Sequence, residues 1–237
     1  MKELLEALDS GELRDELEIV RALRSPFCST AFVETLAASP WVLSRQRIVL
    51  ALVRHPACPR TFAARALPLL GWNDLLAVAA DPRAAMPVRQ QAQNKLLERL
   101  PALTVGEKVS LARKAPPSVI LCLLQEEDPR VVGALLDNPK LQESHCVRLA
   151  AESSSAKVLG QVLRHNRWGT VPAVRMALLA NPSLPPPLAM AMLVSLTDEE
   201  LEGLERNADY PQTVRRLASQ ALWVRQLRKP GEPRYLH

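Results

Sequence analysis

The sequence predicts an all-α protein, arranged as a right-handed α-solenoid of about five units of 40–43 residues. Good helix formers such as Ala, Leu and Arg are abundant, whereas aromatic residues, which favour strands, make up only 4% of the 237 residues. Apolar residues account for 48% of the chain, which indicates a folded rather than a disordered protein. A pattern of residues also recurs at a nearly constant interval, and a unit of this length can bury its apolar face only against its neighbours.

The recurring pattern is clearest when the chain is compared with itself. The segments "PRVVGALLDNPKL" (129–141) and "PAVRMALLANPSL" (172–184) share eight of thirteen residues at an offset of 43. Residues 51–99 also align with residues 177–225 without a gap, at an offset of 126, or about three units of 42. One aliphatic position marks each unit, with spacings of 40, 43, 43 and 40 residues between Ile48, Val88, Val131, Val174 and Val214.

The first helix of a unit is expected to begin near the marker residue, as at residues 174–180, and to end before a proline. Proline pushes the preceding residue out of the α region, so the helix stops there. His55 occupies the position before proline that Asn takes in two other units, and a structural role is expected for it. The steps in question are His55-Pro56, Asn138-Pro139 and Asn181-Pro182.

A second helix follows, and we expect it at residues 62–70 and 188–196. The segment "NPSLPPPLAMAML" (181–193) predicts how the corner between the two helices is built. Pro182 ends the first helix, and Pro185 and Pro186 hold an extended step. Pro187 can then take the first helical position, where no backbone N–H is needed.

A third, amphipathic helix closes each unit and is expected at residues 73–80, 105–114, 156–164 and 198–206. The last of these has Thr197 as its N-cap and Glu200 three residues later, which is the spacing of a capping box. Residues 88–130 match the pattern poorly, because no Asn-Pro step appears there.

The phrase "VRMALLANPSLPPPL" (174–188) resembles the leucine-rich repeat variant family, a bacterial relative of HEAT-like solenoids, and the unit length is similar to that of HEAT and armadillo repeats. The resemblance covers roughly residues 20–226 and is best at residues 131–149 and 174–193. It implies an α-solenoid fold and no common activity. For the founding member, the family implies a separate cysteine cluster that holds an iron–sulfur centre. The scattered cysteines of this chain do not match that cluster, and no cofactor is expected.

We expect residues 1–226 to form a single repeat domain, with an acidic N-terminal cap helix at residues 1–22, followed by a basic, flexible tail at residues 227–237. The N-terminus is unlike a signal peptide, and prolines interrupt the longest uncharged run, at residues 176–197, so a membrane span is not expected. A soluble cytoplasmic protein is predicted. Its four cysteines are expected to be buried free thiols in a reducing compartment, at Cys28, Cys58, Cys122 and Cys146.

Motifs for catalysis or metal binding are weak. The sequence contains no P-loop, G-x-G-x-x-G, G-x-S-x-G or H-E-x-x-H motif. His145 and Cys146 could form a nucleophile pair, but adjacent residues on a helix point in different directions. A zinc site would have to join these two residues to His55 and Cys58, 90 residues away. His165 is expected to be a cation at a helix C-terminus.

The net charge of the chain and its distribution also bear on function. The net charge is +5 and the pI about 9.3, so nucleic-acid binding is possible but not favoured. Residues 1–18 hold two basic and seven acidic residues, whereas residues 214–237 hold six basic and one acidic residue. These ends are either solvated caps or surfaces for weak head-to-tail self-association.

The function we expect is that of a non-enzymatic scaffold of bacterial type, which binds a partner protein on one face of the helical stack. Arg89, Arg175 and Arg215 each follow the marker valine and would form a basic ladder along one side of the stack. Together with Arg216 they are the candidate partner-binding residues. Alternatively, these arginines pair with acids such as Asp128 or Glu205.

The other function considered is that of a basic-groove nucleic-acid-binding protein or, less expected, a DNA glycosylase. Such an enzyme would need aromatic and acidic residues beside basic ones. The only loose candidates are Trp72-Asn73-Asp74 and Arg167-Trp168. The simpler interpretation is that the tryptophans pack between units, at Trp41, Trp72, Trp168 and Trp223.

Overall fold

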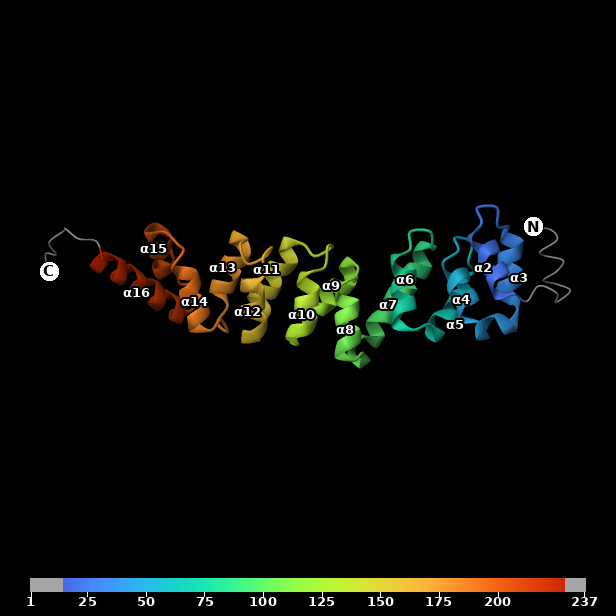
Figure 1. Ribbon diagram of the computed structural model, residues 1–237, viewed down its shortest axis with the longest axis horizontal. Helices are drawn as coiled ribbons and strands as arrows, with labels where there is room; N and C mark the ends of the chain where they lie inside the picture. The colour runs from blue at the N-terminus through green and yellow to red at the C-terminus, as the bar shows by residue number, and fades with distance from the viewer. Residues whose placement is uncertain (1–14, 229–237) are drawn as a thin grey trace. The chain divides into compact units, whose positions relative to one another are not determined.

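The computed structural model describes residues 15–228, which form fifteen α-helices and three short 3-10 helices, with no strand among these residues (Figure 1). The predicted all-α class is therefore confirmed. The helices group into two compact units that meet between Thr104 and Val105, and we describe each unit by itself. Most of the predicted cap helix (1–14) and of the predicted tail (229–237) lies outside the described residues. None of the described helices is long and apolar enough to cross a bilayer.

The N-terminal unit is built from six of the α-helices. Helix α2 packs against α4, and α5 and α6 both pack against α7. Phe32, Ile48 and Phe62 are among its fully buried side chains. The elements are α2 (Glu16–Arg24), α3 (Thr30–Ala38), η1 (Pro40–Ser44), α4 (Gln46–Val53), α5 (Arg60–Ala66), η2 (Leu67–Leu69), α6 (Trp72–Ala80), α7 (Met86–Arg99) and η3 (Leu100–Ala102).

The C-terminal unit contains the other nine helices of the described chain. Helix α8 packs against α10, α11 against α13, and both α14 and α15 against α16. Leu111, Ile120 and Val131 are among its fully buried side chains. The elements are α8 (Val105–Ala112), α9 (Pro117–Leu123), α10 (Pro129–Leu136), α11 (Glu143–Glu152), α12 (Ala156–Arg164), α13 (Pro172–Ala180), α14 (Pro186–Leu193), α15 (Asp198–Arg206) and α16 (Gln212–Arg228).

The offset of 126 found in the sequence is also present in the helices. Helices α4, α5, α6 and α7 begin at residues 46, 60, 72 and 86, and α13, α14, α15 and α16 begin at residues 172, 186, 198 and 212. Each pair of starts differs by 126 residues, so residues 46–99 and 172–225 fold alike. We call two positions 126 residues apart in these segments equivalent.

Several predicted helix bounds are confirmed and others shift. The helices expected at residues 156–164 and 198–206 have these bounds, and the Thr197–Glu200 capping box is present. The second helices begin two residues earlier than expected. The first helical residue of α14 is Pro186 rather than Pro187, because the extended step ends at Pro185 (φ −60°, ψ 136°).

Helix α7 departs from the predicted unit. It runs for 14 residues without the break that follows α4, α10 and α13. The reason is chemical, because residues 88–99 contain no proline to remove a backbone donor and stop the helix. The equivalent helix α16 is also long, with 17 residues.

The corners that follow the helices share one hydrogen bond. The side chain of the residue that ends the helix accepts from the backbone N–H two residues later, as in an Asx turn. The amide oxygens of Asn138 and Asn181 accept at 2.8 Å, and His55 accepts through Nδ1 at 3.1 Å. The residue before proline thus caps the corner with its side chain. This role adds to the backbone restriction imposed by proline, from which the helix end was predicted.

Asn138 and Asn181 are buried and also reach across to another helix. Asn138 Nδ2 donates to Ala112 O at 2.6 Å, at the end of α8. Asn181 Nδ2 donates to Ala150 O at 2.8 Å and Ser153 O at 2.9 Å, at the end of α11. Carbonyls in the last turn of a helix lack intrahelical partners. A single amide side chain therefore closes its own corner and the end of a neighbouring helix.

Two equivalent arginines close the ends of the second helices. Arg225 donates to Val194 O and Leu196 O, both at 2.8 Å, beyond α14. Arg99 donates to Pro68 O and Leu70 O, beyond α5. Donor and acceptors alike are separated by 126 residues, so these contacts belong to the shared fold.

The corner asparagine predicts a measurable loss of stability. Asn138→Ala leaves buried carbonyls and a backbone N–H without partners, and we expect it to lower the free energy of unfolding by about 2–3 kcal/mol. Asn207 is the control, because it accepts from Asp209 N but is exposed. Asn207→Ala should cost about 0.5–1 kcal/mol in urea-induced unfolding. Equal losses for the two variants would contradict the cross-helix role.

Candidate functional site

Arg175, one of the predicted partner-binding residues, is engaged by the fold. Its guanidinium donates to Ser195 Oγ at 2.7 Å and to Met192 O at 3.2 Å, at the end of α14. This arginine is half-buried, as are Arg89 and Arg215, whereas Arg216 is exposed. None of the three ladder arginines is therefore fully exposed, and of the four candidate residues only Arg216 is.

The alternative pairing with Asp128 is wrong. Asp128 lies 2.8 Å from Arg130, and the hydrogen bonds from this arginine lower the pKa of the Asp128 carboxyl to about 2. Glu205 forms no ion pair with another described residue. The equivalent residues Arg89 and Arg215 share an unusual feature, since Nε of each is buried without a hydrogen-bond partner in the described structure.

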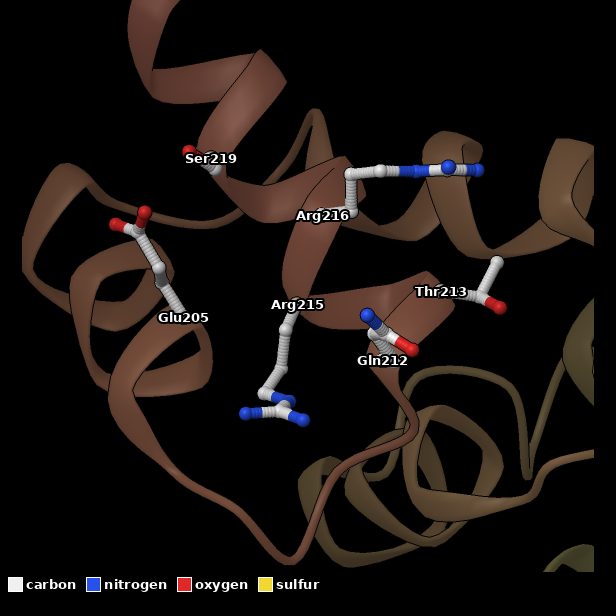
Figure 2. Close-up of a pocket in the computed structure, with 6 residues that line it drawn as sticks. All are labelled: Glu205, Gln212, Thr213, Arg215, Arg216 and Ser219. Carbon is white, nitrogen blue, oxygen red and sulfur yellow. The ribbon is translucent and has the colours of Figure 1, made fainter.

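Arg215 and Arg216 lie at a pocket of about 480 Å³ at the start of α16, together with Glu205 from α15. Figure 2 shows the two guanidinium groups pointing in different directions, so they do not converge on one point. The other lining residues are hydroxyl and amide side chains, Gln212, Thr213 and Ser219. This composition suits polar contacts with a ligand or partner, and the lining includes neither His nor Cys as a nucleophile or general base.

An apolar groove lies between α14 and α16, with a volume of about 500 Å³. We call it the α14/α16 groove. Its apolar side chains are unusually exposed: Val194 by 68%, Trp223 by 55% and Val224 by 41%. The prediction that Trp223 packs between units is therefore wrong, and Trp41 is also exposed. The described residues that line it are Met190, Val194, Gln220, Ala221, Trp223, Val224 and Arg225.

The equivalent groove in the N-terminal unit lies between α5 and α7; it keeps the apolar residues Ala64, Leu67 and Pro68 on one side, and α7 contributes polar side chains on the other. Its volume is about 240 Å³, and its lining includes Asn94, Lys95 and Glu98. Lys95 Nζ and Glu98 Oε2 form an ion pair at 2.6 Å. The equivalent residues in the other groove are Gln220, Ala221 and Val224. Sequence reasoning missed this surface, although the offset of 126 carries the signal, because it places Val224 over Glu98.

A second groove missed by sequence reasoning lies between α2 and α4. We call it the α2/α4 groove; its volume is about 360 Å³. Aliphatic side chains from both helices line it, including Leu17, Val20, Leu50 and Ala51. Its remaining lining residues are Leu23, Pro56 and four arginines, Arg24, Arg47, Arg54 and Arg83.

Asp81 is the buried counter-ion of two of these arginines. Its carboxylate lies 2.6 Å from Arg54 Nε and 3.4 Å from Arg83 Nη2. Burial would raise the pKa of Asp81, but the hydrogen bonds from Arg83 and Arg54 outweigh burial and hold the pKa below its usual value. Neither Arg24 nor Arg47 forms an ion pair with another described residue, so both retain an uncompensated charge.

The candidate chemical residues have structural roles. His145 Nδ1 accepts from Gln142 N at 3.1 Å, and burial raises the pKa of the Cys146 thiol to about 12, so these two do not form an activated pair. His165 ends α12, with Nε2 3.3 Å from Asp137 Oδ1. Among the described residues, no group of three or more His, Cys, Asp or Glu could hold a metal ion.

The cysteines are not all buried as expected. Cys58 and Cys146 are buried, whereas Cys28 is half-buried and Cys122 is exposed. Cys122 lies on α9, in the part of the chain where the repeat pattern is weakest, so its apolar neighbours in sequence were a poor guide to burial.

Of the loose glycosylase candidates, Trp168 is packed into the fold, whereas Asn73 and Arg167 are exposed. Trp168 is buried, its Nε1 donates to Leu136 O at 2.9 Å, and the guanidinium of Arg167 covers its ring at 4.1 Å. The packing role of Trp168 is confirmed. Asp74 accepts from Gln46 Nε2 at 2.7 Å.

Comparison with protein-family models, with curated proteins and with solved structures finds no match. The resemblance to the leucine-rich repeat variant family therefore stays a prediction, compatible with the many packed helix pairs. Functional inference has to come from this chain's own repeats and surfaces.

His55 predicts a pH dependence of stability. Burial and the nearby charge of Arg83 lower the pKa of His55 from 6.5. Folding favours the neutral form, so this contribution is present above pH 6.5 and is lost as the pH falls through the folded pKa. His55→Asn keeps an acceptor that cannot be protonated. It should match the wild type in urea unfolding at pH 8 and exceed it at pH 5, whereas a difference that does not vary with pH would contradict this role.

The cysteines predict selective thiol reactivity. At pH 8, a disulfide reagent such as dithionitrobenzoate should modify exposed Cys122 within minutes. Cys58 and Cys146 should react only after unfolding, because burial raises the pKa of each thiol to about 12. Cys122→Ser should remove the fast phase of absorbance change, and persistence of that phase would show that another thiol is accessible.

Proposed function

We propose that the chain is a cytoplasmic, non-enzymatic scaffold of the α-solenoid type, which binds a partner protein through the α14/α16 groove. The observation that carries this proposal is the exposure of Trp223, Val224 and Val194 around one hollow. Exposed apolar clusters of this kind occur at protein interaction sites, and tryptophan is enriched among residues that dominate binding energy.

The equivalent α5/α7 groove supports this interpretation. Residues that build the fold are retained between the two segments, as Arg99 and Arg225 show by their matching carbonyl contacts. Groove residues differ, since the Lys95–Glu98 pair is replaced by Ala221 and Val224. The apolar lining is therefore not a requirement of helix packing at this position. We propose that an amphipathic helix of the partner places its apolar face in the groove.

Nucleic-acid binding is the second candidate function, and the four arginines of the α2/α4 groove favour it. The α14/α16 groove fits that function less well, because Arg225, the one cation among its described lining residues, already donates to Val194 O, Leu196 O and Asp198. Nucleic-acid binding predicts an affinity that falls steeply between 50 and about 200 mM salt. Weak head-to-tail self-association remains a further proposal, since residues 1–18 and 214–237 carry opposite net charges.

Site-specific photo-crosslinking in the producing cell tests the proposed function. A photoreactive phenylalanine analogue at position 224 should yield one adduct of discrete mass, and the same analogue at equivalent position 98 should yield none. Trp223→Ala, with the analogue kept at 224, should reduce the adduct at least fivefold, since an anchor is lost. The absence of an adduct at 224, or equal adducts at both positions, would contradict the proposal.

The mass of the adduct separates the remaining possibilities. An adduct with twice the mass of the chain identifies a second copy of the chain. The groove would then serve self-association and not a different partner protein. An adduct that nuclease treatment removes identifies nucleic acid. Thermal unfolding of each variant shows that the loss of an adduct does not come from loss of the fold.

A further inference from the structure

The α2/α4 groove combines two kinds of surface in one hollow. Leu17, Val20 and Leu50 give it an aliphatic floor, and Leu17 is 54% exposed. Four guanidinium groups line the groove as well. Arg24 lies on α2, Arg47 lies on α4, Arg54 directly follows α4, and Arg83 follows α6. An occupant must therefore offer apolar side chains and negative charge together.

Three of the four arginines of this groove are not required by the repeated fold. At the equivalent positions of the C-terminal unit, Ala173 replaces Arg47, Ala180 replaces Arg54 and Asp209 replaces Arg83. The corner is retained without them, since Asn207 accepts from Asp209 N just as Asp81 accepts from Arg83 N. These three positions thus carry cationic side chains in one unit and none in the other.

The charge of the groove is only partly compensated. Asp81 serves Arg54 and Arg83 together, and its side chain is only 4% exposed, so it is hidden from an incoming ligand. No acidic residue is among the described residues that line the groove. Arg24 and Arg47 are both exposed, on neighbouring helices, with no ion pair to another described residue. These two side chains are available to bind carboxylates from solution.

We propose that the α2/α4 groove binds an acidic amphipathic helix of a partner protein. Aliphatic side chains of this helix enter the floor formed by Leu17, Val20 and Leu50, and its carboxylates pair with Arg24 and Arg47. The groove extends along helices of eight and nine residues, or roughly 12–14 Å, which matches two to three turns of a bound helix. This inference rests on the proposed scaffold function but concerns a different unit and a separate surface.

The composition of the floor favours a helix over a nucleic acid. Single-stranded nucleic acids gain affinity by stacking bases on aromatic side chains, and in residues 15–228 no aromatic side chain lines this groove. A phosphate backbone would engage the arginines and leave the aliphatic floor uncovered. An amphipathic helix covers the floor through residues spaced i, i+3, i+4 and i+7 and keeps its acidic residues at the rim.

Fluorescence anisotropy with the full-length chain tests the proposal. The probe is a labelled 16-residue peptide with leucine at helical spacing and glutamate elsewhere. Control probes carry glutamine or lysine in place of glutamate, and a labelled 16-nucleotide single-stranded DNA represents nucleic acid. We expect saturable binding of the glutamate peptide, at least tenfold weaker binding of the glutamine peptide, and none of the lysine peptide.

Variants assign that binding to the groove. The double variant Arg24→Glu, Arg47→Glu should bind the glutamate peptide at least tenfold more weakly. Leu17→Gln should bind it severalfold more weakly. The matched control is Arg45→Glu with Arg60→Glu, which reverses two exposed arginines that do not line the groove and should leave affinity unchanged. If circular dichroism shows that the charge-reversed variant is not folded, the double variant Arg24→Gln, Arg47→Gln is used in its place.

The proposal is overturned if the glutamate peptide does not bind, or if the groove variants and the control pair behave alike. DNA binding that disappears in the groove variants, without peptide binding, would assign the groove to nucleic acid. Tighter binding of a peptide with the sequence of residues 1–18 than of the glutamate probe would assign it to a second copy. Crosslinking at position 224 is read independently, so failure here leaves the α14/α16 groove unaffected.

Discussion

The helices of this protein are short, and all but two of the fifteen described have seven to ten residues. Since the last four carbonyls of a helix lack intrahelical partners, a large share of the backbone lies at ends that must find other donors. Asn138 and Asn181 provide them by holding a corner with the amide oxygen and a neighbouring helix end with the amide nitrogen. Arg99 and Arg225 do the same for the second helices, so buried packing depends on these polar contacts.

The internal repeat provides a way to separate structure from function within one chain. Positions that build the fold keep a shared contact across the 126-residue offset, as the corner hydrogen bond shows even though His55 is replaced by Asn181. Surface positions change their chemistry while the helices beneath them stay in register. The α14/α16 groove gains apolar side chains and the α2/α4 groove gains arginines, in different units. Two surfaces that differ in this way suit a scaffold that recognises partners by composition rather than by a reactive group.

Much of the helical architecture could be predicted because its signals are local. Proline and its preceding residue mark helix ends, and the Thr197–Glu200 spacing marks a helix start. The surfaces depend on which helices become neighbours, and no local pattern shows that Arg24 of α2 faces the same hollow as Arg47 of α4. Burial of Trp223 and Cys122 was expected from their usual preference, and both are exposed in this fold. Differences in residue type between equivalent positions were the signal in the sequence that could have pointed to both grooves.

The proline after each buried corner asparagine has a chemical consequence for the long-term integrity of the protein. Asparagine deamidates when the backbone nitrogen of the next residue attacks the side-chain amide and closes a succinimide ring. The nitrogens of Pro139 and Pro182 carry no hydrogen and cannot complete this reaction. Conversion of Asn138 or Asn181 to aspartate would place a carboxylate against backbone carbonyls. The proline that stops each helix thus also protects the asparagine amide from deamidation, and this amide holds the helix ends together.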